Sequence, residues 1–430
     1  VTFTAQPAGA NTNLTWYGWD FDLDGNWDLS GAGLGTVTSP PYPPGYHGVA
    51  LTVSNAAAER ASITNLNFIH VAPAVLYVSL LGSHQPPFTN WATAATNLDV
   101  ARQLALGGTT IRITNGVYGI SNTVVLDEAI ILSGAGAQAT ILTPAVASGE
   151  RRVIQMTDSN AVIEDLTVSN GYTTVFGGAG ILMSAGTVRR CAVVKNWTSN
   201  NKHGGGIFIT GGRVTDSLIQ NNIAHLNGGG LYIDGAQAIV SHCRIIGNTS
   251  GMNAGYHGGG IQLNAGTVRN CLIVGNTCGS GGVGGGLRVD GGLLESSTII
   301  GNRGGSAGGG VSASSPGTVT NSILYDNTLA DGSTNNAGGT LSRYGYCCAP
   351  ELTHDPLGTG HINGNPLFRL LGTGYGAART GDDPRLNSGS PCIGAALRLP
   401  WMTDAIDLDG NVRVLGGTPD LGAYETLPTP

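Results

Sequence analysis

The sequence predicts an all-β fold: a right-handed parallel β-helix with an N-terminal immunoglobulin-like β-sandwich and a helical N-terminal cap. Three observations lead to this prediction. Glycine supplies 70 of the 430 residues, about twice its usual share of roughly 7%. Two sequence markers recur with one common period along the middle of the chain. The segments between them alternate apolar and polar residues, which is typical of short strands.

The composition excludes several classes of protein. The net charge is −7 and no basic run is present, which argues against nucleic acid and anionic membranes as partners. No apolar run reaches the length of a membrane-spanning helix. Hydrophobic residues make up 41% of the chain, too many for a disordered protein. The odd number of cysteines, 7 in a large chain, is not a disulfide framework.

The first marker is a glycine cluster followed by an aliphatic residue, from GGAGI (177–181) to GGGV (308–311). Its last glycine moves from 180 to 206, 230, 260, 286 and 310, in steps of 26, 24, 30, 26 and 24 residues. The second marker is a six-residue segment ending in asparagine, from DLTVSN (165–170) to SILYDN (322–327). Because both markers share a period, each repeat is interpreted as one coil, adding about 4.8 Å of rise.

Residues one coil apart stack on each other in such a fold. Small side chains that start the second marker would form an inward column, which includes Cys191, Cys243 and Cys271. We interpret these cysteines as packing residues, because buried free cysteine behaves as a small hydrophobe. The asparagines that end the marker would bond from coil to coil at a bend. This ladder comprises Asn196, Asn222, Asn248, Asn276 and Asn302, with Asn170 and Asn327 at its ends.

Four regions follow along the chain. Residues 1–72 show hairpin spacing and are predicted to form the β-sandwich. Residues 73–106 are predicted to be a linker and a capping helix that covers the open end of the solenoid. The β-helix is expected over 107–345, with about 24–30 residues per coil, and a C-terminal cap over 346–430. A bridge from Cys347 or Cys348 to Cys392 would tie this cap together.

Two segments resemble known modules. YGWDFDLDGNWD together with GYHGVALTVSNAAAE resembles the PKD domain, an immunoglobulin-like sandwich of secreted bacterial proteins. The coils followed by DLDGNVRVLGGTPDLGAYE (407–425) resemble bacterial secreted right-handed parallel β-helix surface proteins with a C-terminal choice-of-anchor-type module. The resemblance implies export and an extracellular, cell-surface location. It supplies no defined catalytic activity.

An acidic turn near the N-terminus is the best candidate metal site. Carboxylates and an asparagine follow the spacing of the first three-quarters of a calcium loop, with Gly25 at its sixth position. The twelfth position is Gly31 and not glutamate. The alternative is a turn whose side chains satisfy their own backbone. The candidate ligands of Ca²⁺, the one cofactor expected, are Asp20, Asp22, Asp24, Asn26 and Asp28. Asp404, Asp407 and Asp409 form a second, weaker candidate.

An enzyme acting on polysaccharide would need acidic or basic side chains converging from neighbouring coils. The residue before each second marker forms such a column. Arg190, Asp216 and His242 would stand there on successive coils. The alternative is an ordinary solvated face. The full column reads Glu164, Arg190, Asp216, His242, Asn270, Ser296 and Asn321.

These observations lead to an expected function. We expect a non-enzymatic extracellular rod, structural or adhesive. A sandwich whose leading strand is missing has an unpaired edge, so subunits could join by β-strand complementation into a surface filament or lattice. The expected partners are other copies, neighbouring surface proteins or polysaccharide. The alternative is a polysaccharide lyase or hydrolase, or a carbohydrate-binding protein using the aromatic residues Tyr172, Trp197, Tyr232 and Tyr256.

Overall fold

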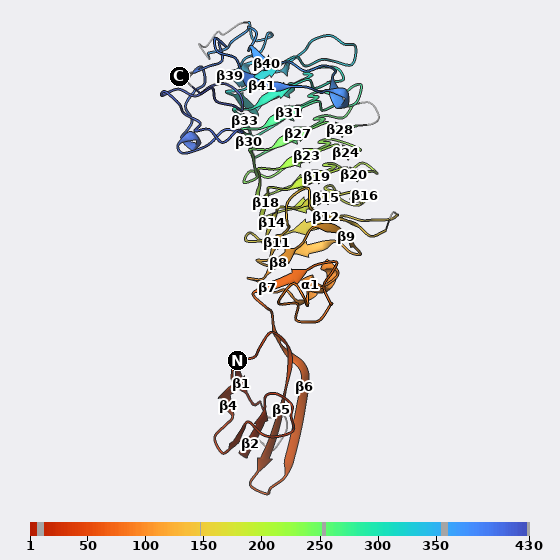
Figure 1. The fold of residues 1–430 in the computed structure, drawn as a ribbon, viewed down its shortest axis with the longest axis vertical. Coiled ribbons are helices and arrows are strands. Elements are labelled where there is room, and N and C mark those ends of the chain that lie inside the picture. The colour runs from red at the N-terminus through yellow and green to blue at the C-terminus, as the bar shows by residue number, and fades with distance from the viewer. Residues whose placement is uncertain (7–12, 147, 252–254, 354–359, 428–430) are drawn as a thin grey trace.

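The computed structural model describes residues 1–6, 13–146, 148–251, 255–353 and 360–427. It shows a rod of stacked β coils with a smaller β unit beyond its N-terminal end (Figure 1). Among the described residues, α1 (Leu98–Leu104) is the single α-helix. The predicted parallel β-solenoid is therefore confirmed, with about nine turns. No helix in the described ranges has the length and hydropathy needed to cross a membrane.

Three long parallel sheets run along the rod, and each coil adds one strand to each. Sheet 1 comprises β10 (Val124–Leu126), β13 (Ile154–Met156), β17 (Ile181–Met183), β21 (Ile207–Ile209), β25 (Leu231–Ile233), β29 (Ile261–Leu263), β32 (Leu287–Val289), β35 (Val311–Ala313) and β38 (Ala337–Gly339). Sheet 2 comprises β7 (Val75–Val78), β8 (Thr110–Ile113), β11 (Ile131–Ser133), β14 (Val162–Glu164), β18 (Thr187–Arg189), β22 (Arg213–Thr215), β26 (Ile239–Ser241), β30 (Thr267–Arg269), β33 (Leu293–Glu295), β36 (Thr318–Thr320) and β39 (Tyr344–Gly345).

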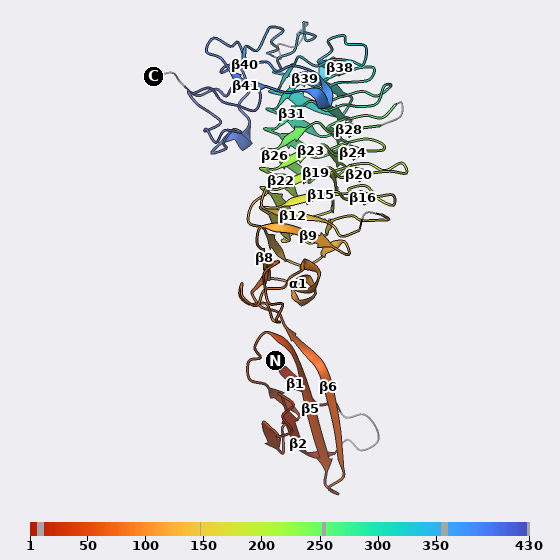
Figure 2. The same ribbon diagram turned by 45° about the vertical axis from the view of Figure 1, so that its right-hand side comes forward.

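Sheet 3 comprises β9 (Gly116–Ile120), β12 (Thr140–Pro144), β15 (Thr167–Ser169), β19 (Ala192–Val194), β23 (Leu218–Gln220), β27 (Arg244–Ile246), β31 (Leu272–Val274), β34 (Thr298–Ile300) and β37 (Ile323–Tyr325). A shorter sheet 4 comprises β16 (Tyr172–Thr173), β20 (Trp197–Thr198), β24 (Ile223–Ala224) and β28 (Thr249–Ser250), stacked along one side of the rod (Figure 2). Side chains alternate along each strand, so most strands of sheets 1 to 3 send one or two apolar side chains into the core.

The glycine clusters bring the backbones of successive coils together. Gly228 has a φ of +69°, a conformation that side chains other than glycine rarely adopt. A Cβ atom on Gly229 would lie 2.3 Å from the carbonyl oxygen of Gly259 on the next coil. Larger residues would therefore push adjacent coils apart, which explains why the repeat keeps glycine there.

The corner between sheets 2 and 3 turns through a single residue of positive φ on each coil. These residues, called here the corner column, are Asp165, Arg190, Asp216, His242, Asn270, Ser296 and Asn321. The sequence-based alignment was wrong by one residue in its first coil: Glu164 pairs with Arg189, so Asp165 stands where Glu164 was expected. Asn170 accordingly stacks beside Lys195 and lies outside the ladder. That coil is one residue shorter than its neighbours.

The asparagine side chains lie at the next bend and are fully buried from Asn196 onward. The Oδ1 atom of each accepts hydrogen bonds from the backbone and side-chain amides of the preceding one. Asn276, for example, accepts from the backbone nitrogen and Nδ2 of Asn248 at 2.9 and 3.0 Å. The series passes through Asn327 to Asn336 and ends on the carboxylate of Glu351. Cys191, Cys243 and Cys271 are buried in the main core beside the corner.

The described residues of the N-terminal unit form six strands in two sheets. One sheet pairs β1 (Thr2–Thr4) with β4 (Thr36–Thr38). The other has the order β3 (Leu29–Gly31), β2 (Leu14–Asp20), β5 (Gly45–Asn55) and β6 (Arg60–Val71). Phe3, Trp19 and Phe21 pack between them. Its immunoglobulin-like topology and the capping role of α1 stay predictions, as do the domain boundaries.

The C-terminal segment (residues 360–427 of the described chain) folds back over the last coils. It contains β40 (Phe368–Leu370), β41 (Asp383–Leu386) and the 3-10 helices η2 (Gly376–Ala378) and η3 (Pro400–Met402); η1 (Leu341–Arg343) precedes it. A second apolar core joins Leu421 and Tyr424 of this segment to Leu272 and Ile300 of sheet 3. The outer face of sheet 3 is therefore covered from β31 onward, because its outward residues become apolar there.

Candidate functional site

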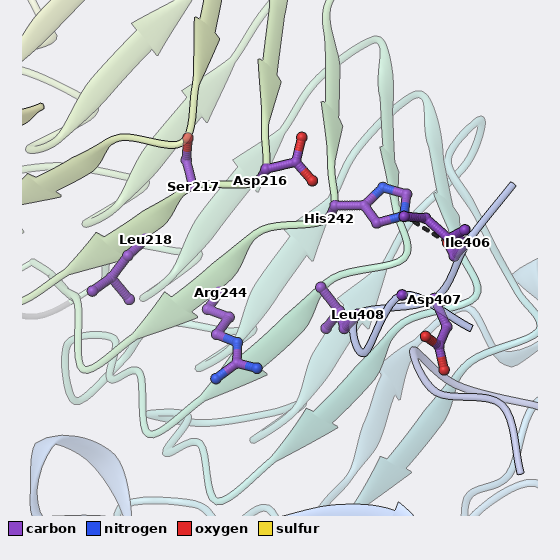
Figure 3. A pocket seen from close by; sticks show the side chains of 9 residues that line it. Asp216, Ser217, Leu218, His242, Arg244, Ile406, Asp407 and Leu408 are labelled. Atoms are coloured by element: carbon purple, nitrogen blue, oxygen red, sulfur yellow. Dashed lines mark hydrogen bonds between the residues drawn. The ribbon is translucent and has the colours of Figure 1, made fainter. Parts of the chain in front are cut away.

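A cleft of about 310 Å³ lies where the C-terminal segment begins to cover the coils. One wall is formed by the corner column and sheet 3, and the other by a turn of the C-terminal segment (Figure 3). Charged side chains from both walls border it. The residues lining the cleft are Asp216, Ser217, Leu218, His242, Arg244, Ile406, Asp407, Leu408 and Gly410.

His242 connects the two walls. Its Nε2 atom lies 2.6 Å from the carbonyl oxygen of Ile406, and a carbonyl oxygen can only accept a hydrogen bond. Nε2 also lies 2.8 Å from Nδ2 of Asn270, an atom that can only donate. Because Nδ2 has the Ile406 carbonyl oxygen as its acceptor, and the contact of Nε2 with that oxygen is the shorter one, we assign the proton to Nε2. The other ring nitrogen, Nδ1, then holds the lone pair, and Figure 3 shows it on the side of the ring away from Ile406. In this tautomer Nδ1 is a base.

Arg244 and Asp216 line the same cleft as this imidazole. Asp216 stands on the preceding coil, about 4.8 Å away along the axis, and accepts a hydrogen bond from the Thr215 hydroxyl at 2.7 Å. Arg244 begins β27, two residues after His242, and its side chain is exposed. It forms no ion pair with any carboxylate in the described part of the chain. The cleft thus presents one unpaired guanidinium and one accessible carboxylate.

Asp407 contributes to the wall but is not free to react. It is 1% exposed, and its two oxygens accept from the backbone nitrogens of Asp409, Asn411 and Glu425 and from the Asn411 amide. This carboxylate holds the turn together. The second acidic turn of the sequence is therefore a structural part of the cleft, and Asp404 lies outside the cleft lining.

Of the three column residues predicted as a trio, two line the cleft. Arg190 does not, because it is held 2.8 Å from the carboxylates of both Glu164 and Asp165. Arg190 in turn lowers the pKa of Asp165. Arg244 and the Ile406 carbonyl were missed, because nothing in the sequence brings residues 406–410 to coils some 164 positions earlier.

The N-terminal acidic turn gathers three of its five predicted ligands. Oxygens of Asp20, Asp22 and Asp28 lie within 4.8 Å of one another. Asp24 and Asn26 instead bond to each other. Both oxygens of Asp20 also accept backbone amides, from Leu23 and Gly25. The triad is an acidic cluster with spare lone pairs, and at the same time a turn that satisfies its own backbone.

The remaining candidate residues lie elsewhere. Tyr172 and Trp197 pack edge to face on sheet 4, with centroids 5.4 Å apart, while Tyr232 stacks on Phe208 of sheet 1. Tyr256 is half-buried in a loop. All seven cysteines are buried free thiols. Cys348 shares the second apolar core with Cys392, whereas Cys347 points into the main core.

Comparisons with known proteins give few matches. No family model matches the chain, and neither does any curated protein. One solved structure that matches is described as "Crystal structure of pectate lyase Pel9A", with 16% sequence identity and a TM-score of 0.48, covering 83% of this chain and 97% of that one. The match concerns the fold alone. The predicted PKD and choice-of-anchor modules receive no support from any of these comparisons.

The expectation that the protein is not an enzyme is corrected at this point. It rested on the regular coils, which the structure confirms, and on terminal modules associated with surfaces, which no family model matches. The solved structure that shares this fold is described as a pectate lyase, so regular coils do not mark a chain as non-enzymatic. What this chain does must be judged from the residues of its own cleft.

Proposed function

We propose that the protein is a polysaccharide lyase that cleaves an acidic, uronate-containing polymer in the cleft at His242. The observation that carries this proposal is that His242, with a lone pair on Nδ1, and the unpaired guanidinium of Arg244 line the same cleft. Elimination from a uronate needs these two groups: a base for the proton next to the carboxylate, and a cation to stabilise the charge that develops there.

The proposed reaction assigns one role to each residue. Arg244 pairs with the carboxylate of the bound sugar and makes the neighbouring C–H bond more acidic. Nδ1 of His242 removes that proton, and the electron pair forms a carbon–carbon double bond as the glycosidic C–O bond breaks. The leaving oxygen takes a proton from water. Asp216, on the preceding coil, stabilises the imidazolium that results.

Hydrolysis fits the same cleft less well. Glycoside hydrolases generally use two carboxylates, one as acid and one as base or nucleophile. Asp216 is the one accessible carboxylate in the cleft lining, because Asp407 is buried and fully bonded. A single carboxylate beside a base and a free arginine supports elimination. Binding without turnover is the second alternative.

The proposal extends to location and cofactor. Acidic polysaccharides lie outside the cell or in its wall, so we infer an extracellular protein. Calcium at the Asp20, Asp22 and Asp28 triad is proposed as a structural ion, because these oxygens converge in the N-terminal unit and not in the cleft. Self-association stays a prediction.

A substrate screen tests the proposal. The protein is incubated with polygalacturonate, alginate and other acidic polymers, and with neutral polymers, and the ultraviolet absorbance of the unsaturated product is followed. We expect product from an acidic polymer only. His242→Asn should lower kcat by about 10²–10⁴-fold, as expected for loss of a general base. Asparagine suits the positive φ at this position, since Asn270 and Asn321 occupy the same column.

Arg244→Ala should lower kcat/KM by about 10²-fold or more. The matched control is Arg112→Ala, which removes another exposed arginine at the far end of the rod and should leave the rate unchanged. Absence of unsaturated product from every acidic polymer would refute the lyase. Hydrolysis products with unchanged ultraviolet absorbance would favour the hydrolase.

A further inference from the structure

The amide of Asn270 makes an unusual contact behind His242. Asn270 is fully buried and follows His242 in the corner column. Its Nδ2 atom donates to the carbonyl oxygen of Ile406 at 2.8 Å and also lies 2.8 Å from Nε2 of His242. Two donors, one from each column residue, thus converge on one carbonyl oxygen, which has two lone pairs to receive them.

The oxygen of the Asn270 amide bears on which way the amide is oriented. Oδ1 of Asn270 is buried and has no hydrogen-bond partner in the described chain, which is unfavourable for a buried polar atom. Rotating the amide would pair Oδ1 with the Nε2 proton but would set it against the Ile406 carbonyl oxygen. The side chain therefore gives up one hydrogen bond in order to hold that carbonyl in place.

From this geometry we infer that Asn270 is a positioning residue, which fixes the Ile406 carbonyl so that His242 keeps its proton on Nε2 and its lone pair on Nδ1. This inference deepens the proposed function and rests on it for its catalytic consequence. The charged groups bordering the ring are Asp216 on the preceding coil, Arg244 on its own coil and Asp407 on the opposite wall. None of these supplies a hydrogen bond to Nε2, whose polar neighbours are the Ile406 carbonyl oxygen and Nδ2 of Asn270. Nε2 therefore keeps its proton as long as Nδ2 donates to the carbonyl oxygen and not to Nε2.

The corner column provides a matched pair of variants. Asn270→Ser replaces the amide donor by a shorter hydroxyl group and keeps a residue that tolerates positive φ, as Ser296 does one coil further. Asn321→Ser makes the same change three coils away from His242. The Asn321 side chain also binds the C-terminal segment, through the backbone nitrogen and the carbonyl oxygen of Leu397. Any general loosening of the segment should appear in both variants.

Nitrogen NMR of the His242 side chain reports its tautomer directly, without any substrate. We expect the wild type and Asn321→Ser to carry the proton on Nε2, and Asn270→Ser to show a mixture of both tautomers. With substrate, Asn270→Ser should lower kcat by about tenfold with little change in KM. A wild-type proton on Nδ1, or equal effects of the two variants, would overturn the inference. A tautomer that shifts as expected in a protein that cleaves no polymer would instead refute the proposed function.

Discussion

The guanidinium of Arg379 lies 2.6 Å from the carboxylate of Asp326, which ties the C-terminal segment to the last turn of sheet 3. A second carboxylate, that of Asp382, also lies 2.6 Å away. The arginine side chain is only 1% exposed. It packs on Gly301, where a Cβ atom would come within 2.5 Å of it. The wall of the cleft is thus held by a buried ion pair as well as by an apolar core.

Arg379→Ala should lower the free energy of unfolding by about 3–5 kcal/mol, because it leaves two carboxylates, 19% and 8% exposed, without a cation. Urea denaturation followed by circular dichroism measures this change. Arg385→Ala serves as the control, since Arg385 pairs with Asp383 in a comparable geometry but is 45% exposed, and it should change stability little. Equal losses in both variants would show that burial is not the deciding factor.

Asn276→Ala should destabilise the protein by about 2–6 kcal/mol. The change leaves the backbone amide of Asn248 and the carbonyl of Ile245 buried without partners, at about 1–3 kcal/mol each. Thermal denaturation of this variant is compared with that of Asn122→Ala, an exposed asparagine outside the ladder. A melting temperature for Asn276→Ala that matches this control would contradict the role assigned to the ladder.

The cysteines should resist alkylation in the folded state. Burial raises the pKa of Cys191 and Cys347 to about 12 and that of Cys278 to about 11, so these thiols stay protonated and inaccessible at neutral pH. Mass spectrometry after maleimide treatment should find no adduct on the native protein and seven in urea. Rapid labelling of any native thiol would contradict the buried placement.

Stability should fall as the pH rises from about 4.5 to about 8. Burial raises the pKa of Glu425 to about 8 from its ordinary value of 4.5, against the opposing pull of Arg413. One guanidinium serves three carboxylates here, those of Asp407, Asp420 and Glu425. Between the two pKa values the unfolded chain releases a proton that the folded chain retains, so alkaline conditions favour unfolding. Below 4.5 and above 8 this contribution is constant.

Glu425→Gln isolates that dependence, because an amide cannot ionise. Chemical denaturation from acidic to mildly alkaline pH should give a flatter profile for the variant than for the wild type. Parallel profiles would mean that Glu425 does not titrate in this range.

Calcium should bind the N-terminal unit weakly, with a Kd on the order of 10⁻⁴–10⁻³ M. Added Ca²⁺ should raise the melting temperature of the wild type, and Asp22→Asn should abolish this shift. Asp24→Asn is the control, because Asp24 lies outside the triad and bonds to Asn26. If Asp22→Asn and the wild type respond alike to calcium, the triad is simply a turn.

The sequence was sufficient for the solenoid and insufficient for the cleft. Coil stacking is local, so a period of about 26 residues places His242 after Asp216 and before Asn270 without further information. The opposite wall has no period. Ile406 reaches His242 because outward residues such as Leu272 and Ile300 are apolar and pack against the C-terminal segment. An apolar outward face predicts that something covers it, but not which segment of the chain does so. The misplaced first coil came from a one-residue difference in repeat length.

The number of coils in the solenoid also determines the dimensions of the cleft. The C-terminal segment is anchored near Asp326, while Arg244 stands on an earlier coil. Deleting or duplicating one whole coil between them would leave each coil's internal packing intact yet slide the anchored wall along the axis by about 4.8 Å. The number of coils between Arg244 and Asp326 thus sets how far the C-terminal wall lies from the coil that carries His242 and Arg244. A chain with more or fewer coils in that interval would have a cleft of different width.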